Sequence, residues 1–143
     1  MRSAPLAAAR VAAATLLAGC SGTAPSVSAG PTAAAVPAAG SSLGPADFAA
    51  AAKLPNTVVL DVRTPQEFAA GHLPGATNID VESADFPQKI ASLDKAATYA
   101  VYCRSGNRSK VAMSAMQRAG FTQLFDLAGG INAWTSAGGA TTT

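Results

Sequence analysis

Two kinds of hydrophobic spacing alternate along the chain between residues 43 and 139. Apolar runs with β-branched or aromatic residues, typical of buried strands, lie at 57–60, 98–102 and 123–127, and a shorter strand is expected around 76–79. Apolar positions at helical spacing lie at 45–53, 65–70, 87–93, 109–119 and 131–137. This alternation predicts an α/β fold with a small, mostly parallel central sheet and helices on both faces.

Cys103 lies between the strand at 98–102 and the helix at 109–119. Open α/β folds place ligand sites at the carboxyl edge of the sheet, so we expect Cys103 at the floor of a pocket there. The loop leads into a helix N-terminus, whose unpaired N–H groups favour negative charge by only about 0.3 to 1 kcal/mol. Loop amides and the side chains of Arg104 and Arg108 must supply the rest if the sulfur is held as a thiolate. The alternative is a buried structural cysteine before a basic turn.

The motifs around this loop resemble, in order, those of the single-domain rhodaneses over residues 43–139. The matching motifs are Asp61-Val62-Arg63, Glu67-Phe68, Gly71-His72-Leu73-Pro74-Gly75-Ala76, Asn78-Ile79 and Gly129-Gly130-Ile131-Asn132-Ala133-Trp134. The resemblance implies the rhodanese-like fold and sulfurtransferase activity, with Cys103 as the sulfur-carrying nucleophile. It also implies that the transferred sulfur is bound by the loop residues Arg104, Ser105, Gly106, Asn107, Arg108 and Ser109.

The chemistry that the resemblance implies consists of two sulfur transfers. The Cys103 thiolate attacks the outer sulfur of thiosulfate or a similar small anion, and the resulting persulfide passes its sulfur to a thiol or to cyanide. A protein can also serve as the sulfur acceptor, and no metal or organic cofactor is expected. We expect Arg104 to bind the anionic donor, and Arg108 to brace the loop and add positive potential.

Two other functions compete with this interpretation. Cysteine phosphatases resemble it in their loop but place the second arginine one position further from the cysteine, whereas Arg108 is the fifth residue after Cys103. The shorter loop fits a single sulfur atom better than a phosphoryl group. A non-catalytic or redox-sensing module at the cell envelope, which uses the same pocket to bind a sulfur species or a partner protein, is the alternative to an enzyme.

Several family positions near the site are expected to be structural. Asp61 and Arg63 are predicted to form a charge-assisted contact that shapes the pocket wall. Thr64 and Glu67 have the spacing of a capping box, so Glu67 is expected to bond back to the start of its helix rather than to act as a base. His72 is the only histidine, and we interpret it as a structural residue because it lies in a Gly-His-Leu-Pro-Gly turn.

The first 19 residues have the pattern of an export signal. Arg2 and Arg10 precede the apolar stretch 11–18, which is too short to remain as a membrane-spanning helix. The small residues before Cys20 resemble the lipobox of bacterial lipoprotein signal peptides, which implies removal of residues 1–19 and acylation of Cys20. We therefore expect a lipid-anchored protein on the extracytoplasmic face of the cell membrane or outer membrane. An ordinary secreted protein and a mitochondrial transit peptide are the alternatives, because arginine and alanine abound and acidic residues are lacking.

Composition separates the rest of the chain into a tether and a domain. Residues 20–42 begin with the lipidated Cys20 and continue as an uncharged segment of Ala, Pro, Ser, Gly and Thr, which predicts a disordered tether. Residues 43–139 form the predicted rhodanese domain, and residues 140–143 a short tail. The chain has ten Lys and Arg against eight Asp and Glu. Because two of the arginines lie in the signal, the remaining chain is balanced, and no nucleic-acid partner is expected.

Overall fold

A five-stranded, all-parallel sheet forms the centre of the protein, with the strand order β1-β5-β4-β2-β3. The computed structural model describes residues 35–143. Its strands are β1 (Ser41–Leu43), β2 (Thr57–Asp61), β3 (Thr77–Asn78), β4 (Thr98–Tyr102) and β5 (Leu124–Leu127). The parallel sheet confirms the predicted fold class, and β4 coincides with the predicted strand.

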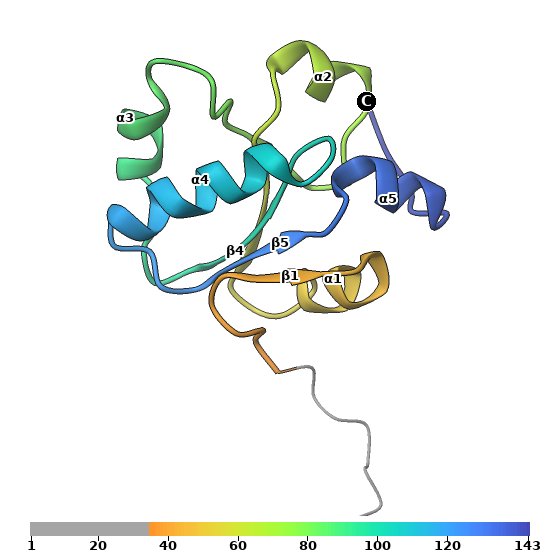
Figure 1. Ribbon diagram of the computed structural model, residues 1–143, viewed down its shortest axis with the longest axis horizontal. Coiled ribbons are helices and arrows are strands. Elements are labelled where there is room, and N and C mark those ends of the chain that lie inside the picture. Colours follow the sequence, from red (N-terminus) through yellow and green to blue (C-terminus); the bar gives the residue numbers. More distant parts are fainter. Residues whose placement is uncertain (1–34) are drawn as a thin grey trace, which may run out of the picture. The chain divides into compact units, whose positions relative to one another are not determined.

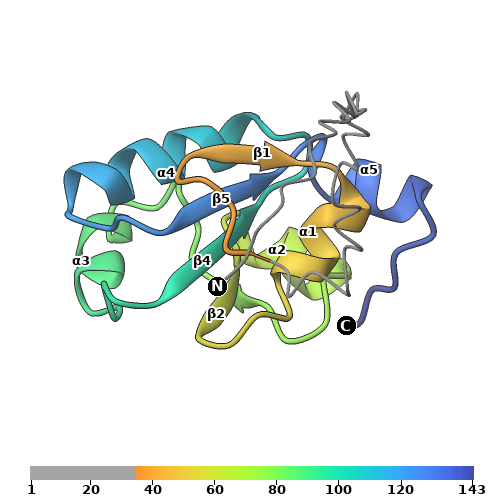
Figure 2. The ribbon, with the colours of Figure 1, turned by 90° about the horizontal axis from the view of Figure 1, so that it is seen from below.

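Helices cover both faces of this sheet (Figures 1 and 2). They are α1 (Pro45–Ala51), α2 (Pro65–Ala70), α3 (Phe86–Ala91), α4 (Asn107–Arg118) and α5 (Gly130–Ser136). Buried side chains of α3 and α4 pack in one hydrophobic cluster, and those of α1 and α5 pack in another. The two clusters lie on opposite faces of the sheet, so each face has its own core.

The central strand β4 determines which face Cys103 occupies. All five residues of β4 are buried, as expected for a strand covered on both faces. Tyr99 and Val101 belong to the cluster of α3 and α4, whereas Ala100 and Tyr102 belong to that of α1 and α5. Because side chains alternate along a strand, Cys103 follows Tyr99 and Val101 and faces α4.

Helix α4 ends in a glycine cap. Gly120 has φ 96°, its N–H donates to Gln117 O at 3.0 Å, and the N–H of Phe121 donates to Met116 O at 3.1 Å. This pair of hydrogen bonds is the Schellman motif. The buried Phe121 then meets the edge of Tyr99, with ring centroids 5.4 Å apart, so the cap fixes the end of α4 against β4.

Both predicted boundaries of the domain need correction. Ser41 and Ser42, assigned to the disordered tether, pair with Phe125 and Asp126 of β5. This edge strand has no hydrophobic signature, because it is held by backbone pairing rather than by burial of large side chains. The predicted tail is also docked: Thr142 and His72 exchange two backbone hydrogen bonds of 2.8 and 2.9 Å in an antiparallel bridge.

The expected signal peptide at 1–19, the lipidated Cys20 and most of the predicted tether lie outside the described residues. Within residues 35–143, no helix is both long enough and apolar enough to cross a membrane.

Candidate active site

Cys103 lies in a tight loop between β4 and α4. The residue is 1% exposed, and the N–H of Gly106 donates to its Sγ at 3.1 Å. Gly106 can make this bond because it adopts φ 100°, a left-handed conformation in which glycine is unstrained. Helix α4 begins at Asn107, two residues earlier than predicted. The loop proper therefore ends at Gly106, and the rest of the expected sulfur-binding segment forms the first helical turn.

Most backbone amides of this loop and turn are left without a protein partner. Among residues 35–143, no acceptor lies in hydrogen-bonding geometry to the N–H groups of Arg104, Ser105, Asn107 or Arg108. The first-turn amides of a helix have no intrahelical acceptor, and here no side-chain cap replaces it. One amide thus contacts the sulfur itself, and four more in the same loop and turn have no acceptor in the described part of the chain.

The start of α5, at Gly130, holds this loop in place. The N–H of Ile131 donates to Cys103 O at 2.9 Å, and the N–H of Asn132 donates to Arg104 O at 3.2 Å. A Cβ on Gly130 would lie 2.4 Å from Cys103 O and 2.5 Å from the carbonyl carbon of Arg104. In the sequence, Gly129 and Gly130 stand out only as motif residues, and the contact with the loop was not predicted. Their position between β5, the neighbour of β4, and a helix is the signal that could have revealed it.

Arg108 points its guanidinium at acidic residues rather than at the loop. It donates two hydrogen bonds of 2.8 Å to the Glu67 carboxylate and one of 3.1 Å to Glu82. The hydrogen bonds from Arg108 are the main reason that the pKa of Glu67 falls from 4.5 to about 2. Reciprocally, they raise the pKa of Arg108. This side chain joins α4 to α2, as a bracing residue would. The positive potential that was also expected from Arg108 is offset by Glu67 and Glu82.

Glu67 combines this ion pair with the predicted capping box. Its N–H donates to Thr64 Oγ1 at 3.3 Å, and its carboxylate accepts the N–H of Thr64 at 3.2 Å. The capping pattern is visible in the sequence, since both partners lie in one helical turn. The Arg108 contact spans 41 positions along the chain, so sequence spacing gave no signal for it.

A buried polar network forms the wall beside the loop. Arg63 pairs with Asp61 at 2.6 Å, with side chains 6% and 0% exposed, and also donates to Gly71 O at 2.7 Å. Tyr102 donates its hydroxyl proton to Asp61 and accepts the N–H of Leu73 at 3.0 Å. The expected contact of Asp61 with Arg63 is present. The two buried charges compensate each other, and both side chains have further hydrogen-bond partners.

A second buried carboxylate lies behind the sulfur. Asp126 of β5 is 0% exposed and accepts the Ser109 hydroxyl at 2.7 Å, while Ser109 Oγ lies 3.8 Å from Cys103 Sγ. Ser42 of β1 donates to the other carboxylate oxygen. Asp126 was not predicted as a site residue, although a lone charge inside the apolar strand Leu124–Leu127 is itself an unusual feature.

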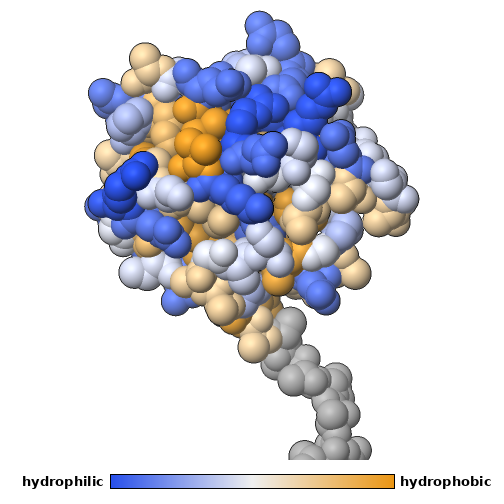
Figure 3. Space-filling view, in the orientation of Figure 1, coloured by the Kyte–Doolittle hydropathy of each residue, from blue (hydrophilic) through white to orange (hydrophobic). Residues whose placement is uncertain are grey.

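A hydrophilic surface surrounds the entrance to this site. A cavity of about 240 Å³ adjoins the loop and is lined by Arg63, Glu67, Ala70, Gly71, Arg104, Ile131 and Asn132. Hydrophilic side chains gather where α2 and the beginning of α4 meet (Figure 3). Arg104 is exposed and, within residues 35–143, forms no ion pair. It is therefore the arginine of this loop whose charge is left for a ligand.

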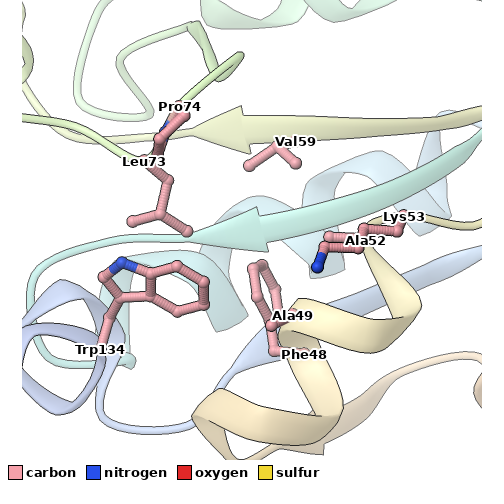
Figure 4. A pocket seen from close by; sticks show the side chains of 8 residues that line it. All are labelled: Phe48, Ala49, Ala52, Lys53, Val59, Leu73, Pro74 and Trp134. Carbon is pink, nitrogen blue, oxygen red and sulfur yellow. The ribbon is translucent and has the colours of Figure 1, made fainter. Parts of the chain in front are cut away.

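Neither His72 nor Trp134 lines the cavity beside the Cys103 loop. His72 stacks on Phe68, with centroids 3.7 Å apart, and its Nδ1 lies 2.9 Å from Phe68 O. Trp134 packs edge-on against Phe48 and helps to line an apolar cavity of about 290 Å³ that does not include Cys103 (Figure 4). In the part of the chain that the structure describes, no group of three or more His, Cys, Asp or Glu side chains is arranged to hold a metal ion.

Replacing Gly130 by alanine should displace the loop. Gly130→Ala combines the strain of a positive φ, about 1 to 2 kcal/mol, with a clash against the backbone of Cys103 and Arg104 that costs a further ~1–3 kcal/mol. Gly138→Ala is the matched control, because Gly138 has φ 82° but no atom near the added Cβ. Urea denaturation and the alkylation rate of Cys103 report the two effects. Equal losses of stability in both variants, with unchanged alkylation, would contradict the role of Gly130.

The Glu67–Arg108 pair should make stability depend on pH in the acid range. Because the pKa of Glu67 is lowered to about 2 in the folded protein, its contribution is complete above about pH 4.5 and is lost as the pH falls toward 2. Glu67→Gln should flatten the fall in unfolding free energy over this range, measured by urea denaturation. Glu82→Gln is the control, since Glu82 is 61% exposed and should leave most of the slope in place.

Comparison with known proteins identifies the family. The sequence profile of the rhodanese-like domain matches residues 44–137. The chain is 39% identical over 89 residues to thiosulfate sulfurtransferase GlpE of Pseudomonas entomophila, covering 62% of this chain and 79% of the relative. It is 37% identical over 89 residues to the chloroplastic thiosulfate sulfurtransferase 16 of Arabidopsis thaliana, covering 55% of this chain and 74% of the relative.

A solved structure gives the same result. The rhodanese-related protein of Thermoplasma volcanium superimposes with a TM-score of 0.63 and 31% sequence identity, covering 71% of this chain and 97% of that protein. The profile match contains the complete Cys103 loop and the Gly129-Gly130 contact that supports it. The chain therefore belongs to the family of rhodanese-like domains.

Proposed function

We propose that the protein is a rhodanese-type sulfurtransferase that carries sulfane sulfur from thiosulfate or a similar donor to a thiophilic acceptor as a persulfide on Cys103. The observation that carries the proposal is the thiol at the end of β4, bonded by the Gly106 N–H and surrounded by amides that have no protein acceptor. Such amides stabilise an anion placed among them. The likeness to thiosulfate sulfurtransferases supports the same reaction class.

The reaction needs only this thiol and the groups around it. The Cys103 thiolate attacks the outer sulfur of the donor, the bond between the two donor sulfurs breaks, and sulfite leaves with the bonding electron pair. The persulfide anion then holds its terminal sulfur among the amides of Arg104, Ser105 and Asn107. An acceptor thiolate or cyanide attacks that sulfur and releases the Cys103 thiolate.

The two arginines of the loop have different tasks in this proposal. Arg104 is exposed and lines the cavity beside the loop, so it binds the anionic part of the donor. Arg108 is neutralised by Glu67 and Glu82 and keeps the first turn of α4 in position. Cys103 is 1% exposed and does not line the cavity, so the donor reaches the sulfur by a small movement of the exposed Arg104 and Ser105.

Mass spectrometry tests the sulfur transfer directly. The full chain with Cys20→Ala, which leaves Cys103 as its sole cysteine, should gain about 32 Da on incubation with thiosulfate, the mass of one sulfur atom. Cyanide should remove the added mass, and Cys103→Ser in the same background should gain none. A folded protein that gains no mass with thiosulfate or other sulfane-sulfur donors would instead support a binding or redox-sensing module, an alternative that the burial of Cys103 favours.

The N-terminal pattern leads to a second proposal, that the enzyme works from a lipid anchor at Cys20 on the extracytoplasmic face of a membrane. Its support is the sequence alone, namely the apolar stretch 11–18 followed by small residues and a cysteine. A palmitate analogue supplied to the bacterial cells that express the chain should label wild type but not Cys20→Ala, and detergent should be needed to extract only the former. Unlabelled wild type that is released without detergent contradicts an anchor.

A further inference from the structure

The proposed sulfur transfer leaves one buried charged residue unused. Asp126 lies on the same face of the sheet as Cys103 and is 0% exposed, yet no lysine, arginine or histidine of residues 35–143 forms an ion pair with it. Its two oxygens accept only the hydroxyls of Ser109 and Ser42. A buried carboxylate held by neutral donors is costly as an anion. A second negative charge nearby makes the anion costlier still.

The second charge is the sulfur itself. Ser109 Oγ lies 2.7 Å from the Asp126 carboxylate and 3.8 Å from Cys103 Sγ, and the geometry allows the thiol to donate to Ser109 while Ser109 donates to Asp126. A thiolate and a carboxylate joined by one hydroxyl would place two negative charges in a space closed to water. Like charges this close in a buried site do not ionise together readily.

The geometry points to a single negative charge shared by Cys103 and Asp126, such that Asp126 takes up a proton when Cys103 becomes a thiolate. The thiol S–H bond breaks as a Ser109 O–H bond forms, and the proton that Ser109 held passes to Asp126. The net charge of the three residues is the same before and after. The inference rests on the proposed function only for the use of the thiolate in sulfur transfer.

The same charge is retained through sulfur transfer. A thiolate that attacks thiosulfate becomes a persulfide anion while sulfite leaves, so the cysteine keeps one negative charge and Asp126 keeps its proton. Removal of the sulfur by an acceptor thiolate regenerates the Cys103 thiolate. Asp126 is thus a positioning residue that sets how readily the thiolate forms, without touching the substrate.

Other charged groups near this pair belong to the loop, to α4 and to the neighbouring strands. The loop and α4 bring Arg104, Arg108 and Lys110, of which Arg104 and Lys110 are exposed and Arg108 is paired with Glu67 and Glu82. The neighbouring strands bring Tyr102 and the Asp61–Arg63 pair, which bond to one another. β1 and α5 carry no ionisable side chain. Asp126 is therefore the acidic group joined to the sulfur through one hydroxyl.

Alkylation of Cys103 tests this inference without requiring sulfur transfer. In the Cys20→Ala background, Asp126→Asn removes the competing charge but keeps the size of the side chain. Iodoacetamide should then modify Cys103 at least ten times faster than in the parent at pH 6, and the pH profile should move to lower pH as a single step. Asp47→Asn, which removes the same charge from an exposed position on α1, should leave the profile unchanged.

Equal or slower alkylation of folded Asp126→Asn at pH 6 would overturn the shared charge. If that variant does not fold, infrared spectroscopy of the parent supplies the second measurement. At a pH where Cys103 is partly thiolate, the parent should show the band of a protonated carboxyl group, and Cys103→Ser should lack that band at the same pH. Absence of that band overturns the inference as well, whereas failure to gain sulfur from thiosulfate would bear only on the proposed function.

Discussion

One close approach of two backbone segments determines where the reactive sulfur lies. The start of α5 presses against the loop after β4, and its first free N–H groups bind the carbonyls of Cys103 and Arg104. The contact is only possible because Gly130 has no side chain. Because α5 binds the carbonyls of this loop, the amides of the loop form no hydrogen bond with α5. The parallel pairing of β4 with β5 brings the two segments together.

Charge around the site is compensated except at two points. Arg108 is neutralised by Glu67 and Glu82, and Arg63 by Asp61. Arg104 at the entrance has no ion pair among the described residues, and Asp126 behind the sulfur has hydroxyl partners only. A positive group at the mouth and a negative one at the back give the pocket a polarity, which favours approach of a small anion from the Arg104 side.

The sequence predicted those features that depend on neighbouring residues. The buried strand β4 and the capping box of Thr64 and Glu67 have local patterns, and the structure contains both. The Asp61–Arg63 contact is also short in sequence. The Cys103 loop was found because a cysteine between a strand and a helix is distinctive, even though the helix begins earlier than its apolar spacing suggested.

Features that depend on distant residues were not predictable in the same way. The Arg108–Glu67 pair and the Ser109–Asp126 bond each join separate elements. The residues of each pair lie far apart in the sequence, so no local pattern predicts these contacts. β1 was assigned to a tether because Ser41 and Ser42 have no strand-like side chains, and only the pairing with β5 makes them a strand. Backbone pairing at the edge of a sheet requires little of the side chains.

The short strand β1 also fixes the direction from which the chain enters the domain. All strands of the sheet run in the same direction, and the pairing through β5 places Ser41 level with Ala100, three residues before Cys103. The chain therefore joins the sheet along its β1 edge, and β5 separates that edge from the strand that carries the thiol.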